Sequence, residues 1–448
     1  MSQTLNMTRG KPLSLLIRFA LPLMLGNVFQ QLYTVVDTAI VGRGVGMDAL
    51  AALGTVDWLN WMMLGLVTGL CQGFGVRISQ KYGEGDLPGM RHTIGQSALL
   101  SAAIALLGVV VSQLGLPLFL WILRVPEALS GMASLYIRIL FAGFPVMVFF
   151  NLCSSVLRAV GDSKTPLLAM VAASITNIAL DALAVFVLGW GIGGAAAATV
   201  FAQCLAGVIC FVRIWRSPQL RFTREDLRFH RERALDLVRI GLPIGGKNVI
   251  LSLGGIGLQS IVNGFGTAFI AGYTATNKLY GLLEIAALSY CYAVTTYVGQ
   301  NYGAGEHDRI RKGMKSALVL FLVTALVIAV IIVLFGRSIT GLFLTADDPA
   351  LLAEAGNVAY TYLCVMAACL PILYLLYLYQ AGLQGLGRTG VGMITGIVEL
   401  FLRIGFALVS AALVWPFGLF VAEVSAWWGG GLIFIVAYYL NARELLHN

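Results

Sequence analysis

Charged residues are scarce in this chain. Only 11% of its 448 residues are Asp, Glu, Lys or Arg, and 59% are hydrophobic, whereas a soluble chain carries about 25% charged residues. This composition excludes an ordinary soluble domain and favours an integral membrane protein. The apolar runs exceed the roughly 20 residues that a spanning helix needs, and they are too unbroken for barrel strands of alternating polarity.

Histidine and cysteine are also few. The four histidines lie in or beside basic loop segments, and the seven cysteines contain no C-x-x-C pair, which argues against a zinc site and a disulfide framework. The sequence also lacks a G-x-S-x-G motif and a Walker loop. Because a membrane-embedded enzyme needs a convergent nucleophile, base or metal cluster, we expect no enzymatic activity, no metal centre and no cofactor.

Twelve apolar runs predict an all-α integral membrane protein with twelve transmembrane helices. They lie at about residues 15–41, 51–76, 94–123, 135–158, 166–189, 194–213, 239–264, 270–299, 316–344, 357–386, 390–416 and 419–441. The first run has no small-residue cleavage site after it, so we do not expect a signal peptide.

The positions of the basic residues predict the orientation. Most of the 29 Lys and Arg residues fall in the N-terminal tail and in alternate loops, and they are densest between Arg213 and Arg239. The positive-inside rule then predicts that both termini are cytoplasmic. The formal charge of +8 reflects this topology, and nucleic acid is not an expected partner. We expect a monomer in the cytoplasmic (inner) membrane of a bacterium or archaeon.

The chain contains an internal repeat. The run from Gln80 to Asp86 (QKYGEGD) recurs 220 residues later as Gln300 to Glu306 (QNYGAGE). Three further matches keep an offset of 226: Pro145 with Pro371, Arg158 with Gln384, and Gly161 with Gly387. A register held over this length indicates duplication. Because each half has six spans, the halves share one orientation and are related by a pseudo-two-fold axis along the membrane normal.

The repeat predicts three parts. They are an N-lobe at 1–214, a basic cytoplasmic linker at 215–238 and a C-lobe at 239–448. Two six-helix bundles with a cavity between them suit alternating access, in which one bundle rocks against the other. This organisation favours a transporter over a receptor, which would bind its ligand without gradient-dependent flux.

Buried acids in the N-lobe are the first candidates for a functional site. Asp37 lies in the first span, with Tyr33 one turn before it on the same face. Asn177 and Asp181 are four residues apart in the fifth span, so their side chains lie on one helical face. Intramembrane acids usually face a cavity or a partner; the plainer alternatives are a helix-end position for Asp37 and a packing role for Asp181.

The C-lobe has its own charged residues. We expect Lys247 to extend to the cytoplasmic surface and Glu399 to pair with Arg403 four residues later on the same helix. Glu284 is open between a cavity position and a packing role. Two other acids are expected at the outer ends of their spans: Asp57 and Glu423.

These motifs resemble those of the multidrug and toxic compound extrusion (MATE) transporters. The resemblance covers nearly the whole chain and rests on four segments: Val36–Gly42, Ala51–Gly54 (AALG), Leu157–Pro166 (LRAVGDSKTP) and Gln300–Gly305 (QNYGAG). It implies twelve helices in two lobes and export of drug-like, often cationic compounds against an inward proton or sodium gradient.

The resemblance also implies an ion-coupling site. In the DinF-like prokaryotic branch, which we favour, the coupling roles fall on Asp37, Asn177, Asp181 and Thr199, and Pro22 has the position linked to bending of the first helix. Another branch uses carboxylates on the seventh and tenth helices, where this chain has Gln259 and Asn263, then Tyr374, Gln380 and Gln384. This departure favours the N-lobe. The side chains expected to line the cavity are Tyr33, Gln259, Asn263, Glu284 and Arg403.

Burial disfavours the charged form of a carboxylate, so Asp37 or Asp181 could accept a proton from outside. Their oxygens also suit sodium, and the sequence does not choose between the two ions. The alternative function is a flippase or exporter of lipid-linked oligosaccharides or metabolites from the same superfamily. A pyrophosphate substrate would call for several cations in the cavity and often fourteen spans, which this sequence lacks.

Overall fold

The computed structural model describes residues 4–123, 125–341 and 349–446, which are helical and contain no strand. Their thirteen α-helices and one π-helical turn have the following bounds: α1 Pro12–Gly44, α2 Met47–Glu84, α3 Leu87–Ile122, α4 Glu127–Ala142, α5 Phe144–Ala159, α6 Lys164–Ala182, η1 Leu183–Val187, α7 Gly191–Arg216, α8 Arg231–Val262, α9 Thr267–Gly303, α10 His307–Gly341, α11 Pro349–Gly385, α12 Gly390–Ala412 and α13 Phe417–Leu446.

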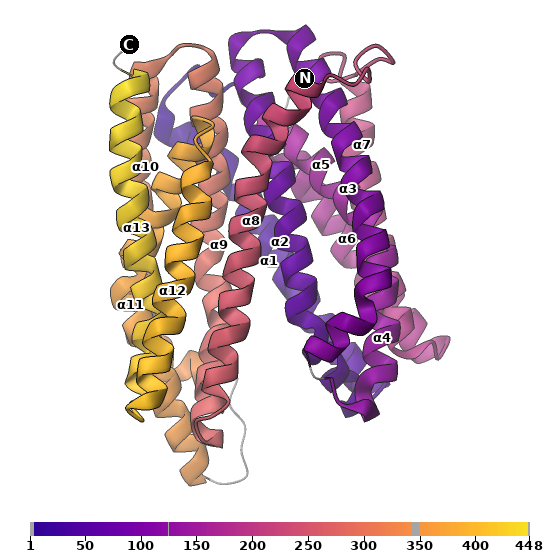
Figure 1. Ribbon diagram of the computed structural model, residues 1–448, viewed down its shortest axis with the longest axis vertical. Coiled ribbons are helices and arrows are strands. Elements are labelled where there is room, and N and C mark those ends of the chain that lie inside the picture. The colour runs from indigo at the N-terminus through magenta and orange to yellow at the C-terminus, as the bar shows by residue number, and fades with distance from the viewer. Residues whose placement is uncertain (1–3, 124, 342–348, 447–448) are drawn as a thin grey trace.

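Eleven of the twelve predicted crossings are long and apolar enough to span a membrane within the described residues. Ten of these are single helices, with α6 and η1 counted as one helix. The pair α4 and α5, bent by 46°, makes an eleventh crossing. The twelfth is α8, which runs the height of the molecule (Figure 1) although polar residues such as Lys247 and Asn248 lower its mean hydropathy.

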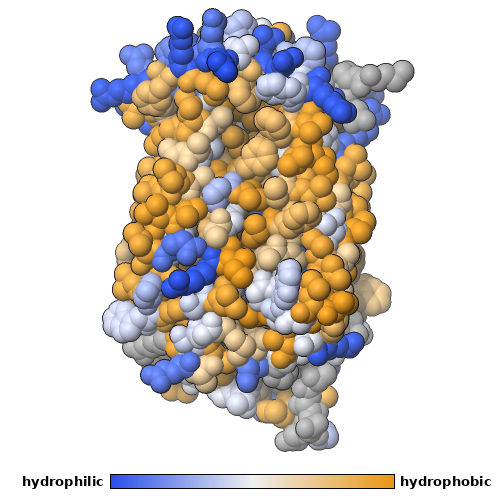
Figure 2. Space-filling view, turned by 90° about the vertical axis from the view of Figure 1, so that its right-hand side faces the viewer, coloured by the Kyte–Doolittle hydropathy of each residue, from blue (hydrophilic) through white to orange (hydrophobic). Residues whose placement is uncertain are grey.

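The surface is divided as a membrane requires. On the face seen in Figure 2, apolar side chains form a broad band beneath a hydrophilic end. Large apolar residues such as Leu114 and Phe401 are 78% and 72% exposed. A broad exposed apolar surface is stable in contact with lipid and unfavourable in contact with water. Both chain termini lie at the hydrophilic end (Figure 1), which we call the terminal end.

Repeated glycines end the helices at matched places in the two halves. Gly85 follows α2 with φ +76°, and Gly305 follows α9 with φ +71°. Gly161 and Gly387, also matched by the repeat, have φ +89° and +78°. Glycine adopts this left-handed conformation at little cost. The same motif therefore sets the same helix ends in each lobe.

Two helix sets form the lobes. We keep the predicted names N-lobe for helices α1 to α7 and C-lobe for helices α8 to α13. In the second set, α9 and α11 pack along each other and against α10 and α13. Buried Trp427, Tyr362 and Tyr374 belong to the C-lobe core. Helix α1 contacts α6 in its own lobe and α9 in the other.

The lobes meet along a seam of small residues between α2 and α8. Gly69 faces the backbone of Gly245, and Gly73 faces the backbone of Gly241, so closely that a Cβ atom on either α2 glycine would collide with α8. Small residues of this kind let helix backbones approach in membranes. The seam therefore fixes how the N-lobe sits on the C-lobe.

The segment between α7 and α8 is anchored to the N-lobe. Gln96 of α3 donates to the carbonyl of Arg228 at 2.6 Å and accepts from the backbone N–H of His230 at 3.0 Å. Arg77 of α2 pairs with Asp236 of α8 at 2.5 Å. The basic linker is thus held against the bundle at both the terminal end of α3 and the start of α8.

Candidate ion-coupling site

Two aspartates meet inside the N-lobe. Asp37 lies on α1 and Asp181 on α6, and the packing of these helices brings the two carboxyl groups close enough for their charges to interact. The residues are only 8% and 0% exposed. Because two ionised carboxylates repel each other and offer acceptors but no donor, a proton or a cation would stabilise this pair.

Four buried oxygens at this site have no hydrogen-bond partner within the described part of the chain. They are Asp37 Oδ1, Asn177 Oδ1 and both carboxylate oxygens of Asp181. The amide of Asn177 donates to Thr199 Oγ1 of α7 at 3.4 Å, so all four residues assigned to coupling lie on helices packed together. Buried oxygens without partners are costly, and a proton or a hard cation supplies what they lack.

The donor set limits what the site can hold. Residues 4–123, 125–341 and 349–446 contain no group of three or more His, Cys, Asp or Glu that could bind a metal ion. A sodium ion between Asp37 and Asp181 would therefore need neutral oxygens as well, and the Asn177 amide and Thr199 hydroxyl are the nearest assigned sources.

The backbone after Asp181 departs from α-helical geometry. The π-helical turn η1 begins two residues later, and the span that contains it runs from Lys164 to Val187. Turns of this type are frequent at functional sites. Asp181 therefore lies inside its span, two residues before the irregular segment.

Two tyrosines surround the aspartates. Tyr33 of α1 and Tyr136 of α4 lie close to Asp37 and Asp181. The position of Tyr33 follows from its spacing to Asp37. Tyr136 has no such signal in the sequence, because only the packing of α4 brings it to the site.

Pro22 lies inside α1, between the terminal end and Asp37, and α1 continues through it to Gly44. Nearby Gly26 is buried and faces Leu167 and Met170 of α6. The proline lacks the N–H that would bond one turn back, which permits bending. Its role in bending remains a prediction.

Glu284 of α9 is held by two tyrosines in the C-lobe. Tyr280 Oη donates to Glu284 Oε1 at 2.6 Å, and Tyr377 Oη of α11 donates to the same oxygen at 2.7 Å. The Tyr280 ring stacks on the buried Trp427 ring, with 5.8 Å between centroids. Glu284 thus has donors, whereas neither oxygen of Asp181 has a hydrogen-bond partner among the described residues.

Two buried ion pairs correct the predictions for the other C-lobe charges. Arg403 binds Glu423 of α13 through two contacts of 2.9 Å, so the predicted pair with Glu399 is wrong. Lys247 is only 4% exposed and pairs with Glu399 at 3.4 Å, so its extension to the surface is also wrong. Glu423 is buried, not interfacial. Packing of α8, α12 and α13 pairs these charges between helices.

The amides predicted to line the cavity from α8 contact each other. Gln259 Nε2 donates to Asn263 Oδ1 at 2.9 Å near the end of α8 away from the chain termini. Two amides of α11, the predicted tenth span, form hydrogen bonds with other helices. Gln380 accepts from Lys247 of α8 at 2.6 Å, and Gln384 accepts from Gln72 of α2 at 2.9 Å.

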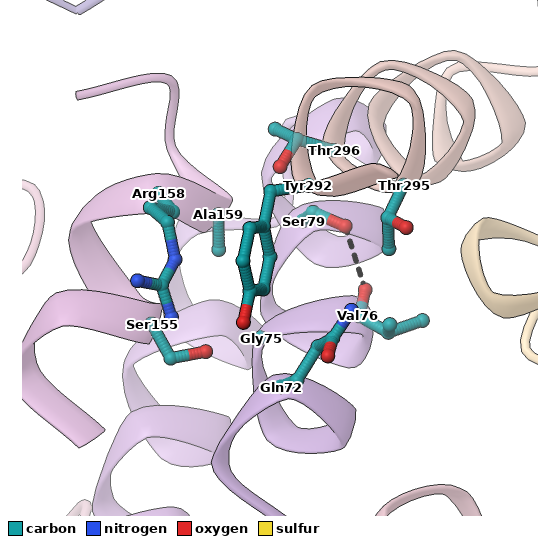
Figure 3. Close-up of a pocket in the computed structure, with 10 residues that line it drawn as sticks. All are labelled: Gln72, Gly75, Val76, Ser79, Ser155, Arg158, Ala159, Tyr292, Thr295 and Thr296. Carbon is teal, nitrogen blue, oxygen red and sulfur yellow. Dashed lines mark hydrogen bonds between the residues drawn. The ribbon is translucent and has the colours of Figure 1, made fainter. Parts of the chain in front are cut away.

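A small polar cavity lies between the lobes (Figure 3). Its lining residues come from α2, α5 and α9: Gln72, Gly75, Val76, Ser79, Ser155, Arg158, Ala159, Tyr292, Thr295 and Thr296. The Arg158 guanidinium lies 4.6 Å from the centre of the Tyr292 ring and donates to Ser154 Oγ at 2.8 Å. None of the ten lining residues is acidic.

Comparisons with known proteins identify similar chains. A family model described as MatE matches residues 22–183 and 243–409. "Probable multidrug resistance protein YoeA" of Bacillus subtilis (strain 168) is 31% identical over 349 residues, which cover 75% of this chain and 74% of that protein. The "FAD transporter" of Shewanella oneidensis is 24% identical over 346 residues, 75% of each chain.

A solved structure shares the whole fold. It is described as "Outward-facing conformation of a multidrug resistance MATE family transporter of the MOP superfamily" and superposes with a TM-score of 0.91. The match covers 100% of both chains at 23% sequence identity. At this identity the likeness concerns the arrangement of the helices.

Proposed function

Because the chain belongs to the MatE family of transporters, we propose that it exports drug-like, cationic or amphipathic organic compounds in exchange for protons or sodium ions. The relatives named for multidrug resistance support the substrate class. The observation that carries the coupling role is the proximity of the buried Asp37 and Asp181 carboxyl groups, three of whose oxygens have no hydrogen-bond partner among the described residues.

The proposed mechanism is competition between the ion and the substrate. With both aspartates ionised, the site attracts a cationic compound; binding of a proton or sodium ion removes charge and weakens that attraction. The compound then leaves on the outer side. One inward elementary charge supplies about 2.3 kcal/mol per 100 mV of membrane potential, so the gradient can drive export.

The distribution of buried charge supports the N-lobe as the coupling lobe. In the C-lobe, Arg403 and Lys247 already neutralise Glu423 and Glu399, and Glu284 accepts from two tyrosines. Groups with fixed partners gain less from an added cation than groups without partners. We therefore assign coupling to Asp37, Asn177, Asp181 and Thr199.

Dye efflux tests this assignment. Cells without their own efflux pumps would express wild type, Asp37→Asn, Asp181→Asn or the control Glu284→Gln, and ethidium accumulation would be measured at equal expression. We expect wild type and Glu284→Gln to lower accumulation and both aspartate variants to lose this effect, because an amide cannot exchange a proton or carry charge. Collapsing the proton and sodium gradients separately would identify the ion.

Two results would contradict the assignment in different ways. Efflux that survives both asparagine substitutions but stops in Glu284→Gln would move coupling to the C-lobe. Accumulation equal to the empty vector for all proteins, with a panel of cationic dyes, would remove the drug-export proposal.

A second candidate function is export of a metabolite or a lipid-linked molecule with an anionic group. It is favoured by the similarity to the FAD transporter and by Arg158, which lines the cavity between the lobes without an acidic neighbour in the lining. Flux of flavin nucleotides and lipid-linked oligosaccharides from loaded proteoliposomes separates this function from dye export. An Arg158→Gln variant would lose anion flux and retain dye efflux.

A further inference from the structure

Residues 4–10, which we call the strap, precede α1 and bind both lobes at the terminal end. The backbone N–H of Leu5 donates to the carbonyl of Gly161 in the N-lobe at 3.0 Å. The backbone N–H of Met7 donates to Gln300 Oε1 in the C-lobe at 3.0 Å, and the Met7 carbonyl accepts from Asn301 at 3.0 Å. The strap therefore bridges the lobes.

The strap is built as a defined structure. The Met7 side chain is fully buried and belongs to the C-lobe core. Asn6 Oδ1 accepts from both the backbone N–H and the hydroxyl of Thr8 at 2.8 and 2.6 Å, which fixes the turn at this point. Arg309 of α10 donates to the carbonyls of Met7 and Gly10 at 3.2 and 3.1 Å.

The strap meets a pair of contacts related by the internal repeat. Gln80 of the N-lobe donates to the carbonyl of Gly385 at 2.9 Å, and Gln300 of the C-lobe donates to the carbonyl of Ala159 at 2.8 Å. The offsets of 220 and 226 convert the first contact into the second. These two glutamines thus close the terminal end of the interface from both sides.

Gln80 and Gln300 differ in the donor that their side-chain oxygen accepts from. The side-chain oxygen of Gln80 accepts from Arg77 of its own helix at 2.8 Å, whereas that of Gln300 accepts from the strap at Met7. Gln300 thus contacts the N-lobe through its amide and the strap through its oxygen. Loss of the strap would leave this buried oxygen without the donor that holds it.

We propose that the strap is a clamp that holds the two lobes together at the terminal end and must release before the transporter opens there. Leu5 binds the N-lobe and Met7 binds the C-lobe, and two residues of extended chain span only about 7 Å. This connection is too short to keep both sets of bonds when the lobes move apart. Separation of the lobes at this end therefore breaks the bonds of Leu5 or those of Met7.

Distances between spin labels test the proposal. Labels would be placed at Glu84→Cys on α2 and Asp308→Cys on α10, both exposed at the terminal end, after replacement of the seven native cysteines. The protein would be measured in lipid nanodiscs as wild type, as a deletion of residues 2–8 and as Met7→Gly. The control is Arg9→Ala, since Arg9 is exposed in the same segment.

We expect both strap variants to raise the ratio of long to short label distances about tenfold over wild type, and Arg9→Ala to leave it unchanged. Unchanged distance distributions in both strap variants would overturn the proposal, and so would an equal shift in Arg9→Ala. If the deletion does not yield folded protein, Met7→Gly decides.

The proposal rests on the alternating-access part of the proposed function and not on the ion site. The labels report lobe separation without substrate or gradient, so failure of the strap proposal and failure of the assignment of Asp37 and Asp181 are distinguishable.

Discussion

Buried acidic residues have different partners in the two lobes. In the C-lobe every acid discussed above has a donor or a cation within reach, as in the contacts of Arg403 with Glu423. The repeat offset of 226 matches Asn177 of the N-lobe with Arg403 of the C-lobe. No arginine therefore lies at this repeat position near Asp181. The C-lobe thus has a fixed cation at a position where the N-lobe has a neutral residue beside the proposed ion-coupling site.

We expect Arg403→Ala to lower the free energy of unfolding by about 3–5 kcal/mol, because it leaves Glu423 buried without its partner. Thermal unfolding of purified protein in detergent would measure the change. Arg138→Ala, at an exposed position on α4, is the matched control and should change stability little. The double variant Arg403→Gln with Glu423→Gln should recover part of the loss, and equal losses in Arg403→Ala and Arg138→Ala would contradict this account.

Whole helices are positioned by their small residues. The seam between α2 and α8 depends on Gly69 and Gly73 facing Gly245 and Gly241, which brings two backbones together across the lobe boundary. Nearer the start of α2, Gly54 has open space at the position that a Cβ atom would occupy. The expected loss of stability on substituting a glycine of α2 therefore depends on the atoms that this glycine faces.

Gly73→Val should separate α2 from α8 and lower stability by about 1–3 kcal/mol, because the added side chain has no room. Gly54→Val places the same side chain in open space on the same helix and should have a much smaller effect. Thermal unfolding of both variants, at equal expression, checks the difference. A similar loss in the two variants would show that helix propensity, not the seam, determines the effect.

On the face that Figure 2 shows, an apolar band lies beneath a strongly hydrophilic end of the molecule, and both termini lie at that end (Figure 1). The linker, with its many arginines, lies between α7 and α8 at the same end. Anchoring of this end in the cytoplasm is what the positive-inside rule predicts. It would also place the strap on the cytoplasmic side of the membrane.

Reporter fusions test this orientation. We expect green fluorescent protein fused after the C-terminal residue to fluoresce and alkaline phosphatase at the same place to be inactive, since the first requires the cytoplasm and the second the periplasm. A fusion of each reporter in the α3–α4 loop near Pro126, at the opposite end, serves as the control and should give the reverse pattern. Active phosphatase at the C-terminus would invert the topology.

Much of the architecture was determined by the sequence alone. Apolar runs predict the helices that cross the membrane, and the register of Gln80–Asp86 with Gln300–Glu306 predicts the duplication, because each segment carries its own apolar length and its own helix-ending glycines. The candidates Asp37 and Asp181 also followed from local properties, since a lone acid in an apolar helix is conspicuous wherever that helix packs.

Only the tertiary structure decided which charges meet. Lys247 with Glu399, Arg403 with Glu423, and the strap with Gln300 are contacts between segments far apart in the chain. Spacing within one helix favoured other partners, because it describes neighbours on a single surface. Pairing across helices depends on how each helix is rotated and how closely it packs, and these are properties of the assembled bundle.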